Sequence, residues 1–168
     1  MTGSIMTAVL AGAIGMGVLI AAVMRKYMIR AYVMNAPYEV VCNNIEKAIK
    51  AVPGWGHPLP DWDFHGAVSK THYFDNLKKK RIFFICKAEY ANAIVDEYHH
   101  MGAMMPCAWA VYETNDAKVY ISKMNIGLMS KMFVGNIIGT TMGKVAREEH
   151  QMMGELNRLI AEDMKKAA

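Results

Sequence analysis

The chain has 168 residues, of which 54% are hydrophobic and 20% are charged, and its net charge at pH 7 is +4. This length and apolar content suffice for one compact domain with its own core, in addition to one membrane segment. Apart from short runs at 25–30 and 78–81, the basic residues are spread along the chain, so a nucleic-acid partner is not expected.

The stretch at 5–24 is the first predicted element, because its 20 residues include no charged side chain. At about 1.5 Å per residue, such a helix crosses a hydrocarbon core of about 30 Å, so we expect one transmembrane helix. Its basic flank begins at Arg25, after the apolar stretch, whereas a cleaved signal peptide carries its charges in front. We therefore expect an uncleaved single-pass anchor at 1–26 in the inner (cytoplasmic) membrane, and a soluble domain at 27–168 on the cytoplasmic side.

Small residues repeat every four positions in this anchor, in runs that include Gly12, Gly15 and Gly17. Such spacing lets a second transmembrane helix approach closely, which would favour assembly within the lipid bilayer. Gly and Ala are also common in membrane helices for reasons unrelated to assembly, so both interpretations stay open.

Beyond the anchor, the apolar pattern alternates between the periods of strands and helices. It predicts strands at 28–34, 81–87, 107–113 and 118–124, the last two as a hairpin, and helices at 38–52, 66–77 and 88–100. Residues 53–66 hold three of the five prolines and are expected to form a loop with at most a short extended piece. The predicted fold is α+β, with a small, mainly antiparallel sheet and packed helices.

The segment at 126–143 has a single charge, and its glycines lie at multiples of four residues. On one helix these glycines form a smooth ridge that would seat a neighbouring helix, the sheet or a membrane surface. The predicted interface on and beside this ridge consists of Met129, Met132, Phe133, Gly135, Gly139 and Gly143. The rest of the chain, from 144 to 168, is predicted as an amphipathic helix with Glu148 and Glu149 on its exposed face.

The three cysteines are odd in number and widely spaced, which excludes a CxxC site and favours reduced thiols. Strand alternation places Cys107 on the same face as Trp109, toward the core. Burial raises the pKa of a thiol, so we expect Cys107 to fill space. A redox or sulfur-carrying role would need a positive neighbour or a second thiol, and the candidates are Lys87, His99, His100 and Cys86.

Sixteen methionines supply many soft ligands of the kind that Cu(I) or haem iron prefers. The candidate metal ligands are Cys107, His99, His100, Met104 and Met105. Methionine also fills irregular cores and adaptable interfaces, and no dedicated copper motif occurs. We therefore expect no cofactor, with haem or copper as the alternative. The histidines at 57, 65 and 72 are expected to belong to a solvated loop region.

Four segments in a fixed order resemble the domain of unknown function 302 family, in the branch with an N-terminal membrane anchor. These segments are "ICKAEYANAIV", "MMPCAWAVYE", "KVYISKMNIGLMSKMFVG" and "MGKVAREE". The resemblance covers residues 28–160 and is most specific at 104–133. It implies a two-layer α+β fold that commonly self-associates, and it implies no established activity.

The sequence contains no glycine-rich phosphate loop outside the anchor, no nucleophile elbow and no HExxH motif, so an enzyme is not expected. We expect a non-catalytic accessory subunit that self-associates or docks on a larger membrane protein complex. The alternative is a thiol redox or haem- or copper-binding module that uses Cys107, Cys86 and nearby histidines and methionines.

Overall fold

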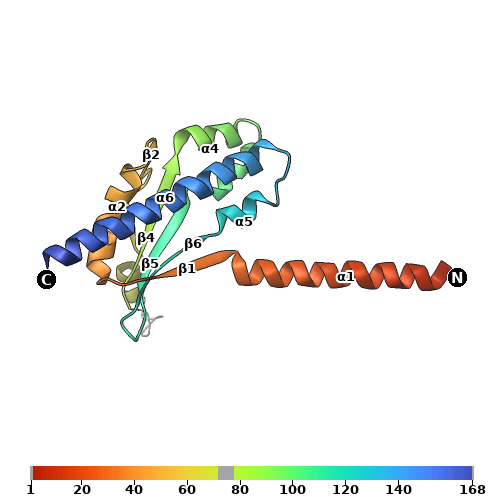
Figure 1. The fold of residues 1–168 in the computed structure, drawn as a ribbon, viewed down its shortest axis with the longest axis horizontal. Coiled ribbons are helices and arrows are strands. Elements are labelled where there is room, and N and C mark those ends of the chain that lie inside the picture. Colours follow the sequence, from red (N-terminus) through yellow and green to blue (C-terminus); the bar gives the residue numbers. More distant parts are fainter. Residues whose placement is uncertain (1, 72–77, 168) are drawn as a thin grey trace.

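The computed structural model describes residues 2–71 and 78–167, and its first element is a long helix that stands apart from a folded domain (Figure 1). This helix, α1 (Thr2–Tyr27), contains a stretch at Val9–Tyr27 that is long and apolar enough to cross a membrane, none of it buried. Arg25 and Lys26 lie in its last turn, where positive charge suits the negative end of the helix. The predicted apolar helix at the start of the chain is confirmed.

The domain combines helices with one antiparallel sheet, as predicted. Its strands within the described residues are β1 (Ile29–Met34), β2 (Trp55–Gly56), β3 (Trp62–Asp63), β4 (Lys80–Lys87), β5 (Cys107–Glu113) and β6 (Val119–Met124). Its helices are α2 (Tyr38–Lys50), α3 (Phe64–Ser69), α4 (Ala88–Val95), the 3-10 helix η1 (His99–Met104), α5 (Ile126–Ser130) and α6 (Ile137–Lys166).

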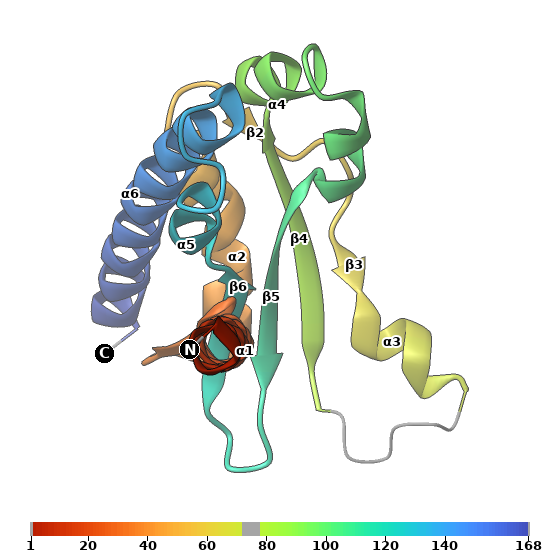
Figure 2. The ribbon, with the colours of Figure 1, turned by 90° about the vertical axis from the view of Figure 1, so that its right-hand side faces the viewer.

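The strand order is β1-β6-β5-β4-β2, and β3 also pairs with β4. All pairs are antiparallel, and the β5–β6 hairpin closes through the amide of Thr114, which donates to the carbonyl of Lys118 at 2.9 Å. Helices α2, α5 and α6 lie on the same side of the sheet (Figure 2). The core between these layers is formed by Val41, Ile45 and Ile49 of α2, Phe83, Ile85, Trp109, Val111 and Ile121 of the sheet, and Met152 and Leu156 of α6.

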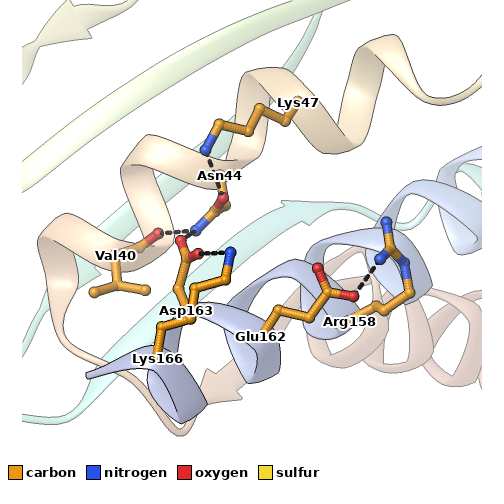
Figure 3. A network of polar contacts seen from close by, with 7 residues as sticks. All are labelled: Val40, Asn44, Lys47, Arg158, Glu162, Asp163 and Lys166. Atoms are coloured by element: carbon orange, nitrogen blue, oxygen red, sulfur yellow. Dashed lines mark hydrogen bonds and ion pairs between the residues drawn. The ribbon is translucent and has the colours of Figure 1, made fainter. Parts of the chain in front are cut away.

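Asn44 links α2 to the end of α6 although it is a polar residue only 1% exposed (Figure 3). Its Nδ2 donates to the carbonyl of Val40 at 3.0 Å and to Oδ2 of Asp163 at 2.8 Å. Its Oδ1 accepts from Nζ of Lys47 at 3.2 Å. Because both ends of the amide have partners, its burial carries no unsatisfied polar group and fixes the register of the two helices.

Two of the predicted helices are shorter than expected. The helix predicted at 88–100 stops at Val95, and the following residues turn before η1, so the histidines at 99 and 100 leave the α4 helix. The helix predicted at 66–77 begins earlier, where Oδ1 of Asp63 accepts from the amide of Gly66 at 2.9 Å and caps α3. The helix ends at Ser69, residues 70 and 71 form a turn, and the predicted part at 72–77 lies outside the described residues.

The single helix predicted over 126–143 is wrong, because the chain turns at 131–136. A new helix begins where Oδ1 of Asn136 accepts from the amide of Gly139 at 3.0 Å, and this cap ends the earlier helical path. In the turn, Gly135 has a φ of 84°, a conformation that residues with side chains rarely adopt. The glycines of the predicted ridge therefore lie on separate elements and form no continuous surface.

Substituting two glycines of α6 should have opposite effects on stability. A Cβ at Gly139 would lie 2.0 Å from the carbonyl oxygen of Phe133, so we expect Gly139→Ala to lower the free energy of unfolding by about 1–3 kcal/mol. A Cβ at Gly154 meets nothing within 4 Å, so Gly154→Ala should raise it by about 0.5–1 kcal/mol. Denaturant unfolding of the full chain in detergent, followed by circular dichroism, measures both; equal effects would contradict the expected close contact.

Candidate functional site

An apolar cavity of about 320 Å³ lies at the edge of the sheet where β4 ends, β5 begins and β6 ends. Residues of α4, η1, α5 and α6 complete its wall. Six of the described residues that line it are methionines, namely Met101, Met104, Met105, Met124, Met129 and Met142. Apolar walls with a few polar groups, enclosing a volume in this range, are typical of a small-molecule binding site.

Two thiols also line this cavity, but they belong to opposite faces of the sheet. Cys107 is paired across β4 and β5 with Ile85 and shares its face, as expected, with Trp109, whereas Cys86 follows Ile85 and points to the other face. Burial raises the pKa of Cys107 to about 12, and the negative charge of Glu149 adds to the effect. Burial also raises the pKa of Cys86, so both groups stay protonated thiols at neutral pH.

The residues predicted as metal ligands do not converge on one point. His99 and His100 are exposed, and Nδ1 of His99 lies 2.7 Å from the carbonyl oxygen of Val95. Met104 and Met105 line the cavity with the thiol at 107, but neither histidine does. Over residues 2–71 and 78–167, no group of three or more His, Cys, Asp or Glu is placed to hold a metal ion. Of the candidate ligands, the cysteine and the two methionines therefore share the cavity wall, and the two histidines lie outside it.

The predicted exposed position of Glu149 is wrong, because this residue is only 1% exposed. Its Oε1 accepts from Nε1 of Trp109 at 2.9 Å, and its Oε2 forms an ion pair with Lys123. Trp109 and Lys123 lie opposite each other on β5 and β6, so the sheet supplies both donors. A signal existed in the sequence, since Val145, Glu149 and Met152 follow the spacing of the buried stripe of the helix.

Glu148, the preceding carboxylate, accepts hydrogen bonds from three residues that line the same cavity. It accepts from Nε1 of Trp55 at 2.5 Å, from Nζ of Lys87 at 3.0 Å and from the hydroxyl of Tyr90. Burial opposes ionisation of Glu148, but these hydrogen bonds outweigh it and lower its pKa. Burial likewise opposes the charge on Lys87, and its pKa is nevertheless raised by Glu148. The cluster ties β2, β4, α4 and α6 together.

The face of the sheet opposite α2, α5 and α6 also carries mainly apolar side chains. We call it the open face and define it by two rows that the strand register aligns, Val33–Tyr120–Tyr112 and Ala31–Ser122–Ala110. Val33 is 56% exposed, and the rings of Tyr112 and Tyr120 stack with their centroids 5.3 Å apart. Antiparallel sheets with one face in water usually alternate apolar and polar residues, and the open face departs from that pattern.

The predicted interface residues are distributed over three environments. Met129 is buried in the core, Phe133 is half-buried, and Met132 is 58% exposed in the turn between α5 and α6. On α1, a Cβ added to a glycine would meet nothing within 4 Å, which holds for Gly12, Gly15 and Gly17. The structure therefore does not bring these residues together, and it leaves space beside the anchor.

Comparison with known proteins concerns the domain and not the helix α1. The family model described as domain of unknown function DUF302 matches residues 30–156. A crystal structure of an uncharacterized conserved DUF302 protein from Bacillus stearothermophilus has a similar fold, with a TM-score of 0.64 and 14% sequence identity. That similarity covers 79% of this chain and 98% of the other. No curated protein matches the chain significantly.

Removing one partner of the buried ion pair should lower the free energy of unfolding more than removing both partners. Glu149→Leu leaves the Lys123 ammonium buried without its carboxylate, so we expect a loss of about 3–5 kcal/mol in the free energy of unfolding. The double variant Lys123→Met with Glu149→Leu should recover much of that loss, because no uncompensated charge remains. Glu46→Leu is the control, since its pair with Lys50 is exposed. Denaturant unfolding measures these free energies. If the loss in the double variant equals the sum of the two single losses, the two residues are not coupled and the prediction is contradicted.

The acid stability of the protein should depend on Glu148. Because its pKa is lower in the folded state than its ordinary value of 4.5, the stabilisation from its ionised form is complete above that value. This stabilisation is lost as the pH falls through the lower, folded pKa. We expect Glu148→Gln to be less stable than the wild type at neutral pH and to lose less stability on acidification. Thermal unfolding across this pH range tests it, with Glu89→Gln on the exposed side of α4 as the control.

Proposed function

The chain belongs to the domain of unknown function DUF302 family, a membership that assigns no reaction, and we propose that it is a non-catalytic, membrane-anchored subunit that assembles with a second copy of itself. The observation that carries this proposal is the open face, a mainly apolar sheet surface that lies on the opposite side of the sheet from α2, α5 and α6. Exposed apolar patches on sheets are typical of protein interfaces.

In this proposal α1 is a single-pass helix in the inner membrane. The basic residues Arg25 and Lys26 at its end favour a cytoplasmic position for the domain. Because α1 leads into β1 almost directly, all copies in one membrane present their sheets in the same orientation. Confinement to a plane raises the effective concentration of copies and favours their association. The open space beside the glycines of α1 leaves room for a second anchor helix.

The chemistry of the open face favours a second copy over a strongly charged partner. Its six defining residues include no ionisable carboxylate, lysine or arginine, and Ser122 is the polar exception beside the two tyrosine hydroxyls; the first charged residue along these rows is Lys80 of β4, next to Tyr112. Two such faces can pack about 10 Å apart through interdigitating side chains, as in sheet sandwiches. A two-fold axis along the membrane normal would relate the copies while both anchors enter the same bilayer.

The thiol redox alternative has weaker support from the geometry. Strand alternation directs Cys86 and Cys107 to opposite faces, whereas a thiol pair would need them on one side. Burial raises both pKa values, and reactive thiols require the opposite shift. The proposal therefore assigns these thiols to the wall of the cavity.

Introducing a charge on the open face should dissociate the assembly. We expect the full chain in mild detergent to be a dimer and Val33→Asp to be monomeric, because the interface would have to bury an unpaired carboxylate. Met164→Asp, at an apolar position 39% exposed near the end of α6, should leave the dimer intact. Light scattering coupled to size exclusion measures the masses. A monomeric wild type, or a dimeric Val33→Asp variant, would refute a second copy as the occupant of the open face.

A further inference from the structure

The end of the anchor helix is hydrogen-bonded to the end of the sheet where the apolar cavity lies. Asn125 follows β6. Its side-chain Nδ2 donates to the carbonyl of Tyr27 at 3.0 Å, and its backbone N–H donates to the carbonyl of Met28 at 2.7 Å. Its Oδ1 also accepts from the amide of Leu128 at 3.1 Å and caps α5. One residue thus joins α1, β6 and α5, so the cavity lies at the end of the domain from which α1 departs.

The exposed part of the cavity wall is apolar and lies at this same end. Ile29, two residues beyond α1, is 57% exposed, and its cross-strand partner Met124 is 36% exposed. Met104 of η1 is 39% exposed, and Ala108 near the start of β5 is exposed as well. Figure 2 looks along α1 toward the domain and shows the start of β5 between α5 and η1. These residues form an apolar entrance to the cavity, at the end of the domain from which α1 departs.

The turn between α5 and α6 lies at the same end of the domain (Figure 1). It exposes Val134 to 84% and Met132 to 58%, and Lys131 beside them is exposed too. Turns in water are usually built from polar residues, whereas apolar side chains next to a lysine suit the boundary between head groups and acyl chains. The turn is therefore a second apolar feature directed at the surface that the anchor enters.

The interior of the cavity suits hydrocarbon and not a charged group. Its charged wall residues are Lys87, Lys123 and Glu149, and Lys87 is paired with Glu148 behind the wall while Lys123 is paired with Glu149, so neither pair offers an uncompensated charge to an ionised ligand. The methionines in the wall are flexible and adapt to irregular apolar shapes. A volume of about 320 Å³ is at the lower end of the range for small-molecule sites, and it suits a single chain better than a whole lipid.

We infer that the cavity beside the anchor junction binds one acyl chain of a bilayer lipid, which enters between α5 and η1 while the head group stays at the membrane surface. The inference rests on the membrane anchoring in the proposed function, but not on self-association. Arg25 and Lys26 at the end of α1 are placed to attract an anionic head group outside the cavity.

A photoactivatable lipid tests this inference on the full chain. The protein is reconstituted in vesicles of phosphatidylethanolamine and phosphatidylglycerol that contain a little phosphatidylcholine with a diazirine at the end of one acyl chain. After irradiation, tandem mass spectrometry locates the crosslinked residues. We expect crosslinks at residues deep in the wall, such as Ile94, Met101 and Met142, which are each less than a tenth exposed. Crosslinks in α1 serve as the internal control for insertion.

Variants at the entrance make the test specific. Ala108→Trp and Met104→Trp place a bulky ring at exposed positions of the entrance and should lower the deep crosslinks by about tenfold or more. Ala161→Trp, on the exposed side of α6 far along the chain, should leave them unchanged. Circular dichroism confirms that each variant is folded.

The outcomes separate this inference from the proposed function. Crosslinks confined to α1 and the turn at 131–136 would overturn lipid entry while leaving the anchor intact. Deep crosslinks that persist at wild-type level in both entrance variants would also overturn it. An absence of crosslinks in α1 would instead refute membrane anchoring, and the lipid site would fall with it.

Discussion

The contact of Glu149 with Trp109 and Lys123 is the interaction on which the arrangement of the domain depends. A carboxylate buried without partners is strongly unfavourable, so α6 adopts the rotation at which Glu149 meets both donors of the sheet. Successive helix residues are about 100° apart, and this rotation therefore directs Glu148 to the other cluster, with Lys87. Two adjacent carboxylates thereby hold one long helix against β2, β4, β5 and β6.

The same sheet presents apolar side chains to two different surroundings. Its inner face packs against α2 and α6, and its open face lies on the side away from these helices. At one edge, Asn125 brings the end of α1, the start of α5 and the apolar cavity together. In the proposed arrangement, a membrane helix holds the domain at this end, so that the cavity faces lipid and the open face is directed toward a neighbour in the same plane. In the proposal, assembly and lipid contact use adjoining parts of the sheet, since Ala110 and Ser122 of the open face also line the cavity.

The sequence predicted correctly those helices and strands that are encoded by the pattern of apolar and charged residues within one segment. The uncharged run at 5–24 forms a helix, and the alternation at 107–113 places Cys107 and Trp109 on one face as expected. The prediction failed at 126–143, where apolar residues and regular glycines suggested one helix. The positive φ of Gly135 interrupts the helix, and the side chain of Asn136 caps a new one. The spacing of the glycines is the same whether the helix is continuous or interrupted, so it did not reveal the break.

The sequence by itself therefore determined the apolar N-terminal helix, the α+β class and most strands, because composition and short-range periodicity encode them. The site was decided only by the tertiary structure. Glu149 meets donors that are 26 and 40 residues away in sequence, and the cavity exists because the ends of three strands meet at one edge. A charged side chain is buried only where partners compensate its charge, and these partners come together only in the folded chain. From the sequence, a charged residue on an amphipathic helix is therefore expected to be exposed.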